Sequence, residues 1–134
     1  MPVLEKFSPI VCQMKKNVLY LHSKKDKKAK MRRTNIVNNI KEQTKLLFPD
    51  AQAYIYGSEA RGDARADSDI DLLILLPEDK VSPEREHDIV SKLYEIELQS
   101  GVIISTIILP RHQWENPRVV TPFYLNVKRE GKLL

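Results

Sequence analysis

The sequence predicts an α/β fold, in the α+β arrangement of a small mixed sheet with flanking helices. Short runs of aliphatic and β-branched residues alternate with longer segments whose apolar residues recur every three or four positions. The expected order is helix, strand, short helix, strand, helix, strand, helix, which is typical of helices packed around one sheet. The chain has 134 residues, 42% of them hydrophobic, which suits one domain with a substantial core.

The first part of this pattern covers a helix, a strand and a loop. Residues 34–48 are expected to form an amphipathic helix that ends at Pro49, because proline disfavours helix in the residue before it. The apolar side of this helix comprises Ile36, Val37, Ile40, Leu47 and Phe48. Residues 51–56 are expected to form the first strand. Residues 58–66 are expected to begin as a short helix and continue as a polar loop.

The second part contains two more strands and two more helices. Residues 69–76 are expected to form a central strand, because five consecutive aliphatic residues do not alternate and both faces must then be buried. A long helix is expected from Ser82, an N-cap residue followed by proline, to Ser100. Residues 102–109 are rich in β-branched residues and predict a third strand. Residues 123–130 predict a last helix.

Charge divides the chain into two expected parts, a basic N-terminal helical extension at residues 1–33 and a domain at residues 34–134. The extension holds ten Lys and Arg and two acids, a balance of +8, whereas the net charge of the whole chain is +4. The domain therefore carries 4 − 8 = −4, and a broad nucleic-acid-binding surface is not expected on it. The lysine run at 24–33 is either a solvated linker or a docking arm for nucleic acid or a partner.

Other bulk features predict a cytoplasmic protein. Cys12 is the only cysteine, which excludes an internal disulfide and fits a reducing compartment. No apolar run approaches the roughly 20 residues that span a bilayer, and the first residues lack the pattern of a secretory signal. Ser8 and Pro9 begin a segment with apolar residues at helical spacing up to Leu21, which predicts one short helix packed on the domain.

A glycine loop followed by paired carboxylates is the strongest functional signal. Gly57 and Ser58 lie a short distance before Asp69 and Asp71. Residues two apart in a strand point to the same face, so the two carboxylates can bind one hard cation such as Mg²⁺. The loop offers backbone N–H groups and a hydroxyl of the kind that bind phosphates. The combination indicates a site for a nucleoside triphosphate with magnesium.

This pattern resembles the minimal nucleotidyltransferases of the DNA polymerase beta-like superfamily. The motif of that family is Gly-Ser, a short Ala-Arg-Gly turn, and Asp-x-Asp on a strand, and here it covers residues 57–71. The apolar pattern extends the resemblance to roughly residues 34–130. The resemblance implies a palm-like nucleotidyltransferase core.

The resemblance also implies roles for individual residues. Asp69 and Asp71 would be the catalytic, metal-binding carboxylates of a site that holds two Mg²⁺ ions if it is active. Ser58 and the amides near Gly57 would bind the β- and γ-phosphates of ATP or another nucleoside triphosphate. Arg61 would either reach the phosphates or form a surface salt bridge with a nearby aspartate.

The chain departs from the family pattern at one position. The family carries a third carboxylate on the strand after the long helix, but residues 102–109 contain no acid. Ser105 or Thr106 is expected on the relevant face instead. Glu95 and Glu97 come late in the preceding helix, where surface positions are expected. The missing acid brings transferase activity into question more than it does nucleotide binding.

Two functions therefore remain open. One is transfer of AMP to a hydroxyl on a partner protein. The resemblance implies that this partner is a small helical HEPN-type protein and that the two form a toxin–antitoxin module, with this chain as the antitoxin. The other is a catalytically silent module that binds a nucleotide or only a partner. Other site types fit poorly, because the three histidines share no ligand spacing and the loop lacks the lysine of a P-loop. Trp114 is expected to anchor the C-terminal segment to the core.

Overall fold

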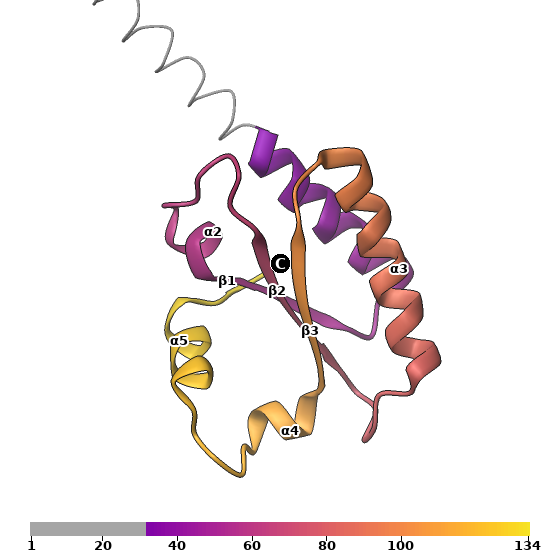
Figure 1. The fold of residues 1–134 in the computed structure, drawn as a ribbon. Helices are drawn as coiled ribbons and strands as arrows, with labels where there is room; N and C mark the ends of the chain where they lie inside the picture. Colours follow the sequence, from indigo (N-terminus) through magenta and orange to yellow (C-terminus); the bar gives the residue numbers. More distant parts are fainter. Residues whose placement is uncertain (1–31) are drawn as a thin grey trace, which may run out of the picture.

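The computed structural model describes residues 32–134, in which a four-stranded mixed sheet forms the centre of the fold (Figure 1). The strands are β1 (Gln52–Tyr56), β2 (Ile70–Leu76), β3 (Ile104–Pro110) and β4 (Lys132–Leu133). Their spatial order is β3-β2-β1-β4. β1 is antiparallel to both β2 and β4, whereas β2 and β3 are parallel. The predicted fold class, a small mixed sheet with flanking helices, is confirmed.

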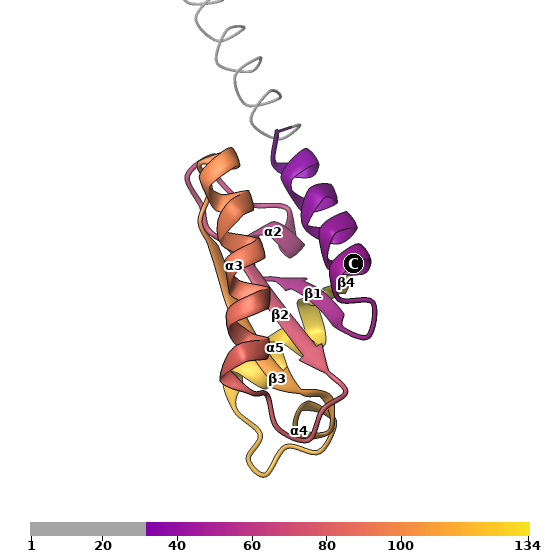
Figure 2. The ribbon, with the colours of Figure 1, turned by 90° about the vertical axis from the view of Figure 1, so that its right-hand side faces the viewer.

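Helices cover both faces of this sheet. A helix over residues 32–47 and α3 (Pro83–Ser100) lie on one face, as Figure 2 shows, and α5 (Pro122–Glu130) lies behind the sheet in that view. The short α4 (Arg111–Glu115) follows β3 on the same side as α5. α2 (Gly57–Arg61) has five residues, like α4, and follows β1 directly.

The central strand β2 separates two hydrophobic clusters, as its uninterrupted aliphatic run predicted. Leu72 and Ile74 pack on the helix over residues 32–47 and on α3. Leu73 and Leu75 point to the other face and pack with Trp114 of α4 and Val127 of α5. Because successive side chains of a strand alternate, odd-numbered residues of β2 share the face covered by α4 and α5.

Local signals in the sequence begin and end the helices as expected. The Ser82 hydroxyl accepts a hydrogen bond from the Arg85 N–H at 3.1 Å, and proline follows it at the first helical position. Thr121 caps α5 in the same way, accepting from the Tyr124 N–H at 3.1 Å. Gly101 ends α3 in the left-handed conformation, with φ of 72°.

Three features of the fold were not predicted. α4 and β4 are short, and β4 is fixed by pairing with Tyr54 and Ile55 rather than by any pattern of its own two residues. Leu47, expected on the apolar side of its helix, is 39% exposed because it lies beside the buried stripe, which runs through Ile36, Ile40, Thr44 and Phe48. Trp114 is buried against α5, as predicted for a residue that anchors the C-terminal segment.

The basic extension at residues 1–33, including the expected helix around Ser8 to Leu21 and Cys12, lies almost entirely outside the described residues. Among residues 32–134, no helix is long and apolar enough to cross a membrane.

Candidate active site

Asp69 and Asp71 lie at the start of β2, on the face that α4 and α5 cover. Asp71 is the second residue of the strand and is half-buried, whereas Asp69 directly precedes the strand and is exposed. The two-residue spacing places both on the face of Leu73 and Leu75. Unlike those two leucines, they lie beyond the hydrophobic layer, where their oxygens can meet solvent or a ligand.

The glycine loop lies directly against the Asp71 carboxylate. Antiparallel pairing puts Tyr56, the last residue of β1, opposite Asp71, so the next residue, Gly57, turns beside it. A Cβ atom at Gly57 would stand 2.3 Å from Asp71 Oδ2, and Gly57 has a φ of +69°. Only glycine suits both the backbone conformation and the space. The sequence therefore brings the loop and the carboxylate together through β-sheet register.

α2 begins at Gly57, which confirms the short helix expected after β1. Tyr56 occupies the N-cap position, and no side chain caps the helix. The first backbone N–H groups, including that of the half-buried Ser58, therefore have no side-chain acceptor at the N-cap. Gly62 ends the helix with a φ of 80°.

The electrostatic environment of Asp71 favours an added cation. Burial raises the pKa of Asp71 above its ordinary value, the charge of Asp69 raises it further, and Arg61 partly offsets the rise. Burial also raises the pKa of Tyr56, and the neighbouring Asp71 charge adds to this rise. Both pKa values rise because negative charge is unfavourable in a partly desolvated environment that already holds another negative charge.

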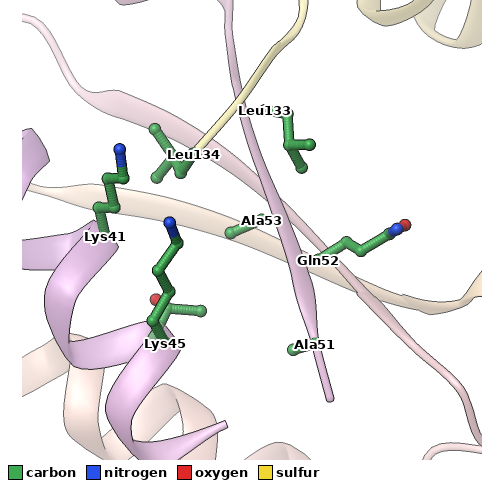
Figure 3. Close-up of a pocket in the computed structure, with 8 residues that line it drawn as sticks. Lys41, Lys45, Ala51, Gln52, Ala53, Leu133 and Leu134 are labelled. Carbon is green, nitrogen blue, oxygen red and sulfur yellow. The ribbon is translucent and has the colours of Figure 1, made fainter. Parts of the chain in front are cut away.

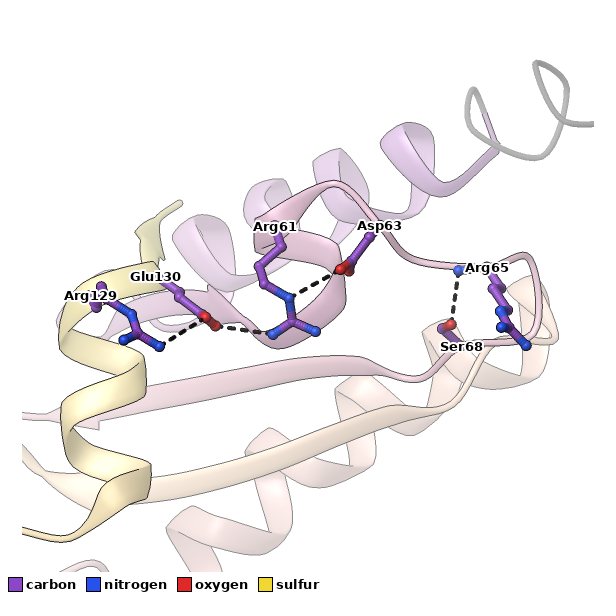
Figure 4. Close-up of polar contacts among 6 residues, drawn as sticks. All are labelled: Arg61, Asp63, Arg65, Ser68, Arg129 and Glu130. Atoms are coloured by element: carbon purple, nitrogen blue, oxygen red, sulfur yellow. Dashed lines mark hydrogen bonds and ion pairs between the residues drawn. The ribbon is translucent and has the colours of Figure 1, made fainter.

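Arg61 makes ion pairs on the side of the loop that faces α5 (Figure 4). Its Nε lies 3.2 Å from Asp63 Oδ2, which is the salt bridge with a nearby aspartate that was one of its two expected roles. Its Nη1 lies 3.1 Å from Glu130 Oε2. Glu130 is the last residue of α5, and nothing in its sequence position marked it as a partner of Arg61. Arg61 thus links the loop to the C-terminal helix.

The remaining polar residues of the loop act locally. Ser68 accepts a hydrogen bond from the Arg65 N–H at 2.9 Å through its side-chain oxygen and so stabilises a turn (Figure 4). This turn carries the chain into Asp69.

Strand register distinguishes Ser105 from Thr106, the two residues expected on the face of the missing third carboxylate. β3 pairs in parallel with β2, and Ser105 is directly opposite Asp71. Thr106 is opposite Leu72, on the other face of the sheet. Of the two candidates that the sequence left open, Ser105 therefore lies beside Asp71, where it offers a hydroxyl in place of a carboxylate.

Glu97, for which a surface position was expected, is half-buried and makes a structural contact. Its Oε1 accepts a hydrogen bond from the Ile104 N–H at 2.6 Å, and Ile104 belongs to the core that α3 covers. This contact ties the end of α3 to the start of β3. Glu95 is at the surface as expected, 3.5 Å from Lys92 and 60% exposed at its side chain.

A pocket of about 190 Å³ lies elsewhere, between the helix over residues 32–47 and the β1–β4 edge. Figure 3 shows Lys41 and Lys45 on one side of it and Gln52, Leu133 and Leu134 on the other. None of the predicted site residues lines this pocket.

Comparison with known proteins identifies the family. The model of the nucleotidyltransferase domain family matches residues 37–127, which is more than half of the chain and includes the whole motif. The chain belongs to the nucleotidyltransferase domain family.

Solved structures agree with this assignment at the level of fold. A Sulfolobus solfataricus protein with a provisional assignment as a nucleotidyltransferase superposes with a TM-score of 0.54 at 23% identity, covering 81% of this chain and 84% of its own. The toxin–antitoxin pair MntA–HpeT, in a mutant form, gives 0.50 at 21% identity, covering 72% and 69%. No curated protein sequence matches significantly.

Nucleotidyltransferases generally use a divalent metal, and the donor set of this chain suits a hard cation. Asp69 and Asp71 supply carboxylate oxygens on one face, and the absence of a Cβ at Gly57 leaves Asp71 Oδ2 unobstructed. Within residues 32–134, no group of three or more His, Cys, Asp or Glu forms a ready-made metal site. Mg²⁺ held by one or two carboxylates usually completes its shell with substrate phosphates and water.

Proposed function

We propose that this nucleotidyltransferase-family chain binds ATP with Mg²⁺ at the Gly57–Asp71 site and transfers AMP to a hydroxyl on a partner protein. The observation that carries the proposal is the contact between Gly57 and Asp71, with Asp69 on the same face. This contact joins the two halves of the motif, the phosphate-binding loop and the carboxylates, in one place. Family membership supports nucleotidyl transfer as the chemistry.

Each residue would have a defined role. Asp69 and Asp71 would hold the metal, and the N–H groups and hydroxyl at Gly57 and Ser58 would bind the β- and γ-phosphates. Bound Mg²⁺ would neutralise charge that builds up on the triphosphate during transfer. Arg61 is engaged with Asp63 and Glu130, so it would have to exchange partners to reach a phosphate.

The acceptor is proposed to be a protein in a toxin–antitoxin module. MntA–HpeT, one of the similar solved structures, is a toxin–antitoxin pair, and the sequence motif independently resembles antitoxin-type nucleotidyltransferases. That resemblance implies a small helical HEPN-type partner. The single cysteine of the chain fits the cytoplasmic location that such a module requires.

A second candidate function is a catalytically silent module that binds the nucleotide or a partner. The placement of Ser105 opposite Asp71 favours it, because a hydroxyl cannot replace a carboxylate as a ligand of a second metal or as a base for the acceptor. The enzyme and a silent module that binds the nucleotide share binding of Mg–ATP and differ in whether transfer follows, whereas a module that binds only a partner would not bind Mg–ATP.

Calorimetry of Mg–ATP binding tests the shared step. Asp71→Asn should weaken binding at least about tenfold in Mg²⁺ buffer, because a metal ligand is lost, and should change little in EDTA. Asp88→Asn, on the exposed surface of α3, is the matched control and should bind as the wild type does. Equal affinity for Mg–ATP in wild type and Asp71→Asn would refute the assignment of the site.

A further inference from the structure

The phosphate-binding loop has little hydrophobic packing of its own. α2 has five residues, and Ala60 is the only one of them that is buried. One small side chain contributes little to the free energy that would hold such a helix in place. Charged contacts must therefore contribute much of the free energy that fixes Gly57 and Ser58 relative to Asp71.

One of these contacts comes from the helix over residues 32–47. Arg33 Nε lies 2.7 Å from Glu59 Oε2, and Glu59 directly follows Ser58. Arg33 Nη1 also donates to the Ala66 carbonyl at 3.4 Å, in the loop that leads to Asp69. A single guanidinium thus contacts both the segment after Gly57 and the segment before Asp69.

Burial leaves this ion pair less screened than its neighbours. The side chains of Arg33 and Glu59 are 5% and 16% exposed, whereas those of Arg61 and Glu130, on the opposite side of α2, are 46% and 19% exposed. Solvent and salt screen buried charges much less than exposed ones. Arg33 is also anchored, because its helix packs on the sheet through Ile36.

The buried guanidinium also depends on Glu59. Among residues 32–134, Glu59 is the only acid that forms an ion pair with Arg33, and Arg33 Nη2 has no hydrogen-bond partner. Loss of Glu59 would leave a buried charge unpaired, and Arg33 would then move toward water. That movement would release both α2 and the loop at Ala66.

We propose that Arg33 and Glu59 are positioning residues of the nucleotide site. Their ion pair would hold Gly57 and Ser58 against Asp71 from the side of the helix over residues 32–47. The inference rests on the proposed function, since it assigns the loop to the triphosphate. Neither residue touches the reacting groups. Glu59 lies between the Gly-Ser and the Ala-Arg-Gly of the motif and is not one of its named residues, so the sequence motif alone does not mark it.

The experiment compares variants of the full chain in two measurements. Glu59→Ala removes one partner, and the double variant Arg33→Leu with Glu59→Ala removes both and leaves no unpaired buried charge. Asp50→Ala is the matched control, because it breaks the Arg85–Asp50 pair, which has the same 2.7 Å separation but lies away from the loop. Hydrogen exchange at residues 58–62 reports loop order without nucleotide, and calorimetry reports Mg–ATP affinity.

Glu59→Ala and the double variant should each speed exchange at residues 58–62 and weaken Mg–ATP binding about tenfold, at a temperature where circular dichroism shows them folded. Asp50→Ala should do neither. Unchanged exchange, or faster exchange with unchanged affinity, would overturn the positioning role. If wild type itself fails to bind Mg–ATP, the proposed function is wrong, and the exchange measurement still decides whether the pair orders the loop. Should Glu59→Ala not fold, the double variant gives both readouts.

Discussion

At the scale of single residues, the close approach of Gly57 to Asp71 is the feature on which the site depends. Two requirements coincide at Gly57, a positive φ of 69° and the lack of space for a Cβ beside Asp71 Oδ2. Gly62, five residues later, has a φ of 80° but no atom near the place where its Cβ would be. A substitution at Gly62 would therefore cause backbone strain alone, whereas one at Gly57 would cause both backbone strain and crowding at the Asp71 carboxylate.

Alanine substitutions at these two glycines should differ in function. Each should cost about 1–2 kcal/mol of unfolding free energy, because an L-residue is strained in the left-handed conformation. Only Gly57→Ala should also displace the Asp71 carboxylate and weaken Mg–ATP binding by an order of magnitude or more. Urea denaturation and calorimetry measure the two effects. A Gly62→Ala variant that loses affinity equally would show that crowding at Asp71 is not the cause.

A carboxylate at position 105 should increase transfer. Ser105→Asp places an acid directly opposite Asp71, at the position where the family carries its third ligand, and we expect at least a tenfold rise in labelled AMP transferred to protein from α-labelled ATP. Thr106→Asp, on the opposite face, is the control and should give no rise. Clear Mg–ATP binding with no gain in Ser105→Asp would favour the silent module, and robust transfer by wild type would favour the enzyme without a third acid.

At the scale of elements, α4 and α5 form a small aromatic layer on the face of the sheet that carries Asp69 and Asp71. Trp114 contacts Phe123 and Tyr124, with ring centroids 6.1 and 4.8 Å apart, and Lys128 Nζ lies 5.9 Å from the Trp114 ring. α5 ends in Glu130, the partner of Arg61. The packing of this layer therefore also determines where one of the loop's ion pairs lies.

Trp114→Ala should destabilise the protein by about 3–5 kcal/mol, because the substitution leaves a cavity where a large buried ring had been. Leu125→Ala, on the same helix pair but 57% exposed, is the control and should change the free energy of unfolding by less than about 0.5 kcal/mol. Urea denaturation followed by circular dichroism measures both. Similar losses in the two variants would contradict the packing role of Trp114.

At the scale of the whole molecule, charge and fold follow the same division. The family match begins at residue 37, and the ten basic residues of positions 1–33 lie before it. Among residues 32–134, the sheet and helices bury two hydrophobic clusters, one on each face of the sheet. We therefore propose residues 34–134 as the nucleotidyltransferase domain and residues 1–33 as a separable basic extension.

A truncated chain that starts at Met31 should remain soluble and unfold cooperatively on heating, because it retains every described residue of both clusters and also Arg33. Differential scanning calorimetry of the truncated and full-length chains makes the comparison. A molten or insoluble product would instead show that the segment before residue 31 completes the core.

Local sequence was enough to predict much of the fold. The uninterrupted aliphatic run of residues 72–76 predicted a central strand, and proline with a preceding Ser or Thr located the starts of α3 and α5. Such signals are local, since periodicity and capping act within a few residues. β4 escaped prediction because its two residues carry no pattern and are held by a distant strand.

For the candidate site, the sequence by itself determined the residue types and their order, a glycine loop followed by Asp69 and Asp71. Tertiary structure decided which other residues join them. Register placed Ser105 rather than Thr106 beside Asp71, because a shift of one residue along a strand reverses its face. Packing between distant segments brought Glu130 to Arg61 and Arg33 to Glu59. The partners in these two pairs are separated by 69 and 26 positions in the sequence, and no local periodicity encodes contacts across such separations.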